Sequence, residues 1–263
     1  MEEAKKPLIL VSNDDGITAK GIRVLVEEVH KLGAEVIVVA PDKPQSGMGH
    51  AISIHGPIRL RESPLFDDLG VKAYECSGTP ADCVKLAKNH VLLNRTPDLV
   101  VSGVNHGSNS SISILYSGTM SAAIEGAIEG LPAIGFSLCE DGPDADFSHT
   151  REYIHKITAQ VLKTSLPKGI ALNVNFPIKQ EEEIKGIKVC RQARAKWQED
   201  FDERFDPYGR QYFWLVGEFV NMDKGEDTDV QALEENYVSV VPSLFDLTAH
   251  QTISELNQTW DIV

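Results

Sequence analysis

The sequence predicts a doubly wound α/β fold built on a mostly parallel sheet. Two apolar runs, 8–11 and 36–40, are continuous rather than alternating, as in strands that are buried on both faces. Between them, the apolar residues of 22–29 recur at helical spacing until Gly33. A strand, a helix and a second strand in this order form a β-α-β unit whose two strands lie parallel.

The same alternation continues along the chain to residue 175. Segments 52–54 and 72–76 are expected to be extended, and the start signals around Pro80 predict a helix that runs to about Leu92. The remaining predicted elements are a strand at 98–103, a helix at 122–128, a strand at 133–136, a helix at 154–162 and a strand at 171–175. Helices are therefore expected on both faces of the sheet.

The character of the chain changes beyond Pro177. Aromatic residues crowd between Trp197 and Phe219, and such a segment is too aromatic to be a linker. We expect residues 1–178 to form the α/β core that carries the active site. Residues 179–263 are expected to form an appended β-rich arm and a C-terminal segment.

Charge and cysteine content narrow the classes of partner. The 263 residues include 39 acidic and 25 basic side chains, a formal charge of −14, which disfavours a stable nucleic-acid or anionic-membrane partner. A small anionic substrate can still bind a local site.

The four cysteines are dispersed, and the apolar run 8–11 is too short for a signal peptide or a membrane span. We expect a cytoplasmic protein with reduced thiols.

Candidate site residues follow directly after the predicted strands, where open parallel sheets bind their ligands. Asp14 and Asp15 follow the first strand, Ser46 lies in the loop after the second, and Asn105 follows strand 98–103. An isolated Asp-Asp pair is more typical of a turn or a helix cap. At the mouth of a buried strand, however, two repelling carboxylates would either raise the pKa of one of them or need a cation between them. Oxygen donors suit Mg²⁺, Mn²⁺ or Ca²⁺ better than zinc.

A second group of candidates could hold an anion. Ser117 leads into the helix at 122–128, so the amides and hydroxyls of 117–119 are placed to bind phosphate at a helix N-terminus, a role compatible with capping. Asn109 is equally consistent with a turn former and with a binding residue. Four histidines could transfer protons, although a solvated or core histidine is the commoner case. They are His50, His55, His106 and His149.

Several ordered motifs closely resemble those of the SurE family, the stationary-phase survival protein E nucleotidases. The matching stretches run through most of the chain. They are Ser12–Gly16, Ser77–Val84, Pro97–Asn109, Tyr116–Thr119, Leu172–Pro177 and Asp206–Arg210.

This resemblance implies a Rossmann-like core and a metal-dependent 5'-nucleotidase that hydrolyses nucleoside monophosphates to nucleoside and phosphate. It places one Mg²⁺ or Mn²⁺ ion on Asp14, Asp15, Ser46 and Asn105, with Asp14, Asp15 and Asn105 in the catalytic role. It places the phosphate beside Asn109, Ser117, Gly118 and Thr119. It also implies a homodimer or homotetramer, in which C-terminal segments beyond about Trp197 are exchanged between subunits.

The sequence leaves open two routes for the hydrolysis and two functions other than catalysis. Direct attack by water is favoured over an aspartyl-phosphate intermediate, because Gly16 stands where the second acid of an Asp-x-Asp strand end would be. Instead of an enzyme, the chain could be a non-catalytic nucleotide-binding regulatory module. It could also be a scaffold whose aromatic arm serves only assembly.

Overall fold

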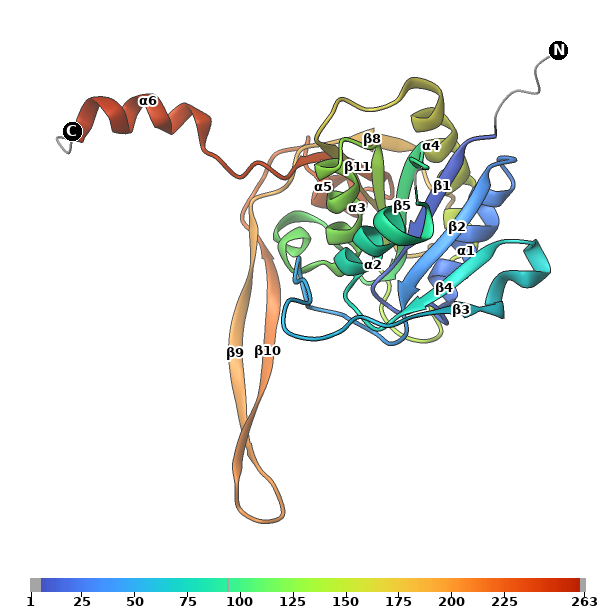
Figure 1. Ribbon diagram of the computed structural model, residues 1–263. Helices are drawn as coiled ribbons and strands as arrows, with labels where there is room; N and C mark the ends of the chain where they lie inside the picture. Colours follow the sequence, from blue (N-terminus) through green and yellow to red (C-terminus); the bar gives the residue numbers. More distant parts are fainter. Residues whose placement is uncertain (1–5, 94, 261–263) are drawn as a thin grey trace.

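The computed structural model describes residues 6–93 and 95–260, and a nine-stranded sheet forms its centre (Figure 1). In spatial order the strands are β3 (Leu60–Ser63), β4 (Lys72–Cys76), β2 (Glu35–Pro41), β1 (Leu8–Ser12), β5 (Leu99–His106), β6 (Ala133–Leu138), β7 (Ile170–Phe176), β11 (Val238–Leu244) and β8 (Ile187–Val189). The six strands from β4 to β7 are all parallel. Strands β3 and β11 run antiparallel to their neighbours β4 and β7.

Two pairs of helices pack against the sheet, α1 (Lys20–His30) with α4 (Arg151–Thr164), and α2 (Pro80–Leu86) with α3 (Gly118–Ile128). Alternate side chains of β1 pack into the two hydrophobic clusters, one on each face of the sheet. Ile9 and Val11 join the cluster that contains α1 and α4, whereas Leu8 and Leu10 join the cluster that contains α2 and α3. Because both faces of β1 are covered, its run of apolar residues is unbroken. The predicted mixed α/β fold with a mostly parallel sheet is confirmed.

The strand order creates a topological switch point between β1 and β5. From β1 the chain proceeds to β2 and β4 on one side, and β5, β6 and β7 then extend the sheet on the other side. Loops leaving β1 and β5 therefore diverge to opposite sides, and a crevice opens at their carboxyl ends. Asp14 and Asp15 follow β1 at this position, and Asn105 lies near the end of β5.

Two local expectations differ from the structure. Residues 52–54 form no strand, because the N–H of Ser53 donates to the carboxylate oxygens of Asp82, at 3.1 and 3.2 Å, instead of to a neighbouring strand. The helix expected over 80–92 ends as α2 at Leu86 and continues as a π-helical turn, Ala87–Val91. The capping box between Thr79 and Asp82 accounts for its start.

Residues 179–260 divide between two parts of the molecule. Strands β8 and β11 extend the central sheet, and the short helix α5 (Asp229–Glu234) packs on β11. Strands β9 (Ala195–Phe205) and β10 (Gln211–Asn221) form a long hairpin that projects from the body, and α6 (His250–Thr259) also lies away from it (Figure 1). A role of this region in oligomerisation stays a prediction.

The state of the cysteines and the length of the helices bear on the expected compartment. Cys76, Cys83, Cys139 and Cys190 are all free thiols. None of the described helices combines the length and the apolar character needed to cross a membrane. The cytoplasmic location stays a prediction.

Candidate active site

Asp14 packs directly on the first turn of α3. Its side chain is buried, and its Oδ1 accepts a hydrogen bond from the hydroxyl of Thr119. The contact is close because residue 118 is glycine. A Cβ at Gly118 would lie 2.6 Å from the Cβ of Asp14 and 2.8 Å from its Oδ2. The end of β1 and the N-terminus of α3 thus meet at one carboxylate.

The carboxyl group of Asp14 is destabilised in its charged form. Burial raises its pKa to about 6, and the charge of Asp15 adds to the increase. Hydrogen bonds from Thr119 act in the opposite direction and offset only part of the effect. A cation placed between the two carboxylates would remove this penalty.

Asp15 joins the loop after β1 to the end of β5. Its Oδ2 accepts the N–H of His106 at 3.1 Å and lies 3.0 Å from the Nδ1 of the same residue. The preceding residue, Asn105, is also buried, and its Nδ2 donates to the carbonyl oxygen of Gly107 at 2.6 Å. This hydrogen bond orients the amide and leaves Oδ1 as its acceptor atom. The structure therefore brings Asp15 and the Asn105 segment together across the switch point.

The loop after β2 contacts both the loop that carries Asp14 and the segment before α3. The N–H of Gln45 donates to the backbone carbonyl of Asp14 at 2.7 Å, and the N–H of Gly49 donates to that of Tyr116 at 3.1 Å. Ser46 is exposed and lies one residue from the first of these contacts. The loops that carry the four predicted metal ligands are thus linked to one another.

The side chains at this site determine which cation they could hold. The described residues contain no group of three or more His, Cys, Asp or Glu side chains that could hold a metal ion. The two carboxylates would therefore need the Ser46 hydroxyl and the Asn105 amide oxygen to complete a coordination sphere. All four donors are oxygens, which suits a hard divalent ion, and the repulsion at Asp14 favours one. The residues present fit Mg²⁺ or Mn²⁺.

The residues predicted to hold phosphate occupy two different settings. Ser117 caps α3, because its Oγ accepts the N–H of Met120 at 2.9 Å. Thr119 directs its hydroxyl to Asp14, so its side chain orients the carboxylate. Gly118 lies between them, where the positive end of α3 meets the carboxylate of Asp14. Contact of these residues with phosphate stays a prediction.

Asn109 is held in a buried polar network. Its N–H donates to the Oδ1 of Asn175, its Nδ2 donates to the Oγ of Ser137, and its carbonyl accepts the Nδ2 of Asn173, each at 2.8 Å. These contacts fix the loop after β5 to β6 and β7. Asn173 and Asn175 were not among the predicted site residues, although two amides inside an otherwise apolar strand indicate a buried polar network.

Comparison with known proteins agrees with these observations. Residues 9–199 match the family model described as "Survival protein SurE". The chain belongs to the SurE family. The 5'-nucleotidase SurE of Cytophaga hutchinsonii is 65% identical over 258 residues, and that of Christiangramia forsetii is 61% identical, each match covering 98% of both chains. The crystal structure of the SurE protein from Aquifex aeolicus superposes with a TM-score of 0.82 at 38% identity, covering 96% of this chain and 99% of that one.

Proposed function

We propose that this SurE-family protein is a metal-dependent 5'-nucleotidase that hydrolyses nucleoside monophosphates to nucleoside and phosphate. The relatives named 5'-nucleotidase SurE match nearly the whole chain, which supports the reaction class. The observation that carries the proposal is the contact of Asp14 with the first turn of α3. A cation held by Asp14 and Asp15 would lie beside a helix end suited to phosphate.

The residues proposed to hold one Mg²⁺ or Mn²⁺ ion are Asp14, Asp15, Ser46 and Asn105. When bound there, the ion supplies Lewis acidity, which neutralises phosphate charge and lowers the pKa of water. Two neighbours position the carboxylates, since Thr119 donates to Asp14 and the N–H of His106 donates to Asp15. The backbone amides at the start of α3 would hold the phosphate oxygens, because the first N–H groups of a helix have no acceptor within the helix.

We also propose that water attacks phosphorus directly. An aspartyl-phosphate route would need a second acid two residues after Asp14, and Gly16 occupies that position with a left-handed φ of 93°. Rapid quenching after mixing with a labelled phosphomonoester is expected to leave the protein unlabelled. Label trapped on Asp14 or Asp15 would contradict direct attack.

Removal of divalent metal is the simplest test of the function. Phosphate release from nucleoside monophosphates should stop when a chelator is added and return with excess Mg²⁺ or Mn²⁺. A panel of nucleotides assayed against several ions also measures the substrate preference. Full activity after exhaustive chelation would contradict metal dependence, and nucleotide binding without release under every ion would favour a regulatory module.

The projecting hairpin supports a further proposal, that the chain forms a homodimer or homotetramer with exchanged C-terminal segments. The side chains of Phe201 and Trp214 are 63% and 61% exposed, and Tyr208 near the tip is 84% exposed. Helix α6 has no buried residue. Exposed apolar surface of this extent marks an interaction site. Sedimentation should give a particle larger than the 28.9 kDa chain. Trp214→Lys should weaken this assembly. A monomeric wild type would contradict the proposal.

A further inference from the structure

One buried carboxylate, that of Asp229, joins the loop after β5 to the base of the hairpin. The residue is 1% exposed and is the first residue of α5. Its Oδ2 accepts the N–H of Ser111 at 2.8 Å, and its Oδ1 accepts the N–H of Ala193 at 2.9 Å. Oδ1 also accepts the N–H of the adjacent Val230 at 2.9 Å. A single side chain therefore fixes two segments that are remote from it in sequence.

The loop held by Asp229 connects both halves of the proposed active site. It follows Asn105, a proposed metal ligand, and continues through the 3₁₀ turn Ser111–Tyr116. The turn leads directly to Ser117, the cap of α3. A shift of the loop at Ser111 would therefore displace a metal ligand at one end and the phosphate-binding turn at the other.

Ser111 itself adopts a conformation that the surrounding structure has to maintain. It is fully buried and has a left-handed φ of 52°, which is unfavourable for a residue other than glycine. Its N–H donates to Asp229, and its Oγ donates to the carbonyl of Ala193 at 2.8 Å. The strained position is thus held by Asp229 and by the segment that leads into the hairpin.

The two residues before Ser111 are also held by side chains. The N–H of Asn109 donates to the Oδ1 of Asn175 at 2.8 Å, and the N–H of Ser110 donates to the Oγ of Ser108 at 3.1 Å. Side chains therefore determine the path of this loop. Of the three acceptors only Asp229 is a carboxylate, and hydrogen bonds to carboxylates are the stronger kind.

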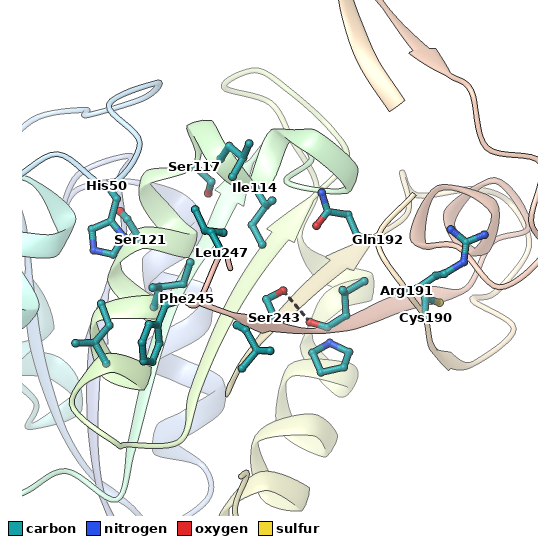
Figure 2. A pocket seen from close by; sticks show the side chains of 16 residues that line it. His50, Ile114, Ser117, Ser121, Cys190, Arg191, Gln192, Ser243, Phe245 and Leu247 are labelled. Atoms are coloured by element: carbon teal, nitrogen blue, oxygen red, sulfur yellow. Dashed lines mark hydrogen bonds between the residues drawn. The ribbon is translucent and has the colours of Figure 1, made fainter. Parts of the chain in front are cut away.

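The base of the hairpin packs on the turn that precedes α3. Gln192, which precedes Ala193, lines a cavity of about 650 Å³ together with Ile114 and Ser117 (Figure 2). At the start of β9, the Nε1 of Trp197 donates to the Oγ of Ser113 at 3.4 Å. The segment bonded to Oδ1 of Asp229 therefore supports the same turn as the segment bonded to Oδ2.

We propose that Asp229 is a positioning residue of the enzyme, which holds the loop after β5 in the conformation that presents Asn105 to the cation and the first turn of α3 to the phosphate. The carboxylate acts on the site through the backbone N–H of Ser111. This assignment rests on the proposed nucleotidase function and deepens it.

The first test removes one acceptor oxygen from the full-length protein. Asp229→Asn keeps the size of the side chain but replaces an oxygen with an amide nitrogen, so one buried N–H loses its acceptor. The kcat/KM for AMP at saturating Mn²⁺ should fall about a hundredfold, because a displacement of about 1 Å can cost that much. An unchanged kcat/KM would overturn the proposal.

Asp98→Asn is the matched control. The carboxylate of Asp98 also accepts a remote backbone N–H, that of Leu8 at 2.8 Å. This contact lies at the start of β1, at the opposite end of the strand from Asp14. The substitution should therefore leave kcat/KM at the wild-type value.

Two further measurements separate positioning from stability. In chelated buffer, hydrogen exchange of residues 107–116 should become at least tenfold faster in Asp229→Asn, whereas that of α1 should change less. The affinity for Mn²⁺, measured by titration without substrate, should fall about tenfold. A lower melting temperature with wild-type Mn²⁺ affinity and wild-type kcat/KM would show a merely structural role and overturn the proposal.

Ser111→Ala tests the same junction without altering the buried carboxylate. It removes only the hydrogen bond from Oγ to the carbonyl of Ala193, and it should lower kcat/KM about fivefold. If Asp229→Asn does not fold, this variant decides, and an unchanged kcat/KM would overturn the proposal. If the wild type releases no phosphate from AMP, the nucleotidase function fails instead. The Mn²⁺ titrations then still decide whether the junction at Asp229 positions the cation site.

Discussion

Asp14→Asn should lower the rate of phosphate release about a thousandfold. The side chain is a proposed ligand of the cation, and a catalytic metal supplies several kcal/mol of transition-state stabilisation, of which about 1.4 kcal/mol corresponds to each tenfold in rate. The measurement is kcat/KM for a nucleoside monophosphate at saturating Mg²⁺ or Mn²⁺. Activity within a few-fold of the wild type would remove Asp14 from the metal site.

The same substitution should stabilise the protein when metal is absent. Because the folded state raises the pKa of Asp14 from 3.8 to about 6, it binds more protons than the unfolded state between these values, so stability falls as the pH rises through them. Asn removes this loss, which amounts to about 3 kcal/mol at most above pH 6. It also keeps an oxygen for the hydrogen bond from Thr119.

Denaturant unfolding in chelated buffer measures this effect. Asp14→Asn should exceed the wild type in free energy of unfolding at pH 7, and the difference should vanish below pH 4. Asp67→Asn, at an exposed carboxylate, is the control and should stay within about 0.5 kcal/mol of the wild type. Equal or lower stability of Asp14→Asn at pH 7 would contradict the buried-charge argument.

Gly118→Ala should lower kcat/KM about a hundredfold, although it adds only one methyl group. Its Cβ would lie 2.6 Å from the Cβ of Asp14, closer than side chains pack, so the carboxylate must move. A displacement of about 1 Å in a catalytic group can cost about a hundredfold in rate. Gly118 has a helical conformation, so alanine itself introduces no backbone strain there.

A second glycine provides the control for this substitution. A Cβ at Gly56 would meet no atom within 4 Å, so Gly56→Ala should leave kcat/KM unchanged. Both proteins should unfold at or near the wild-type temperature in chelated buffer if the effect of Gly118→Ala is confined to the site. Wild-type activity of Gly118→Ala would show that the position of Asp14 against α3 is not required.

The central strands could be predicted because burial on both faces leaves continuous apolar runs. The runs 8–11 and 36–40 differ from β1 and β2 by one residue at their ends. The sequence pattern of 52–54 did not reveal that this segment joins no strand of the sheet, because the N–H of Ser53 donates to a distant carboxylate, that of Asp82. The start of α3 was placed four residues late, since the cap at Ser117 allows the helix to begin at Gly118.

The site was predicted as a meeting of strand ends, and its contacts depend on geometry that a sequence pattern does not contain. Asp14 and Thr119 are 105 residues apart in the sequence. Their hydrogen bond forms only when α3 is oriented about its axis so that Thr119 faces the end of β1. The contact of Asp15 with His106 likewise depends on how β5 ends. His50 belonged to the candidate histidines, but its pairing with Glu125 required the packing of a loop onto α3.

The central claim is that Asp14, Asp15, Ser46 and Asn105 hold one divalent cation beside the first turn of α3. The most direct measurement is anomalous diffraction from crystals of the protein grown with Mn²⁺ and phosphate. We predict one manganese peak per chain between the carboxylates of Asp14 and Asp15, with phosphate at Gly118. Manganese bound elsewhere, with the two carboxylates free of metal, would contradict the claim.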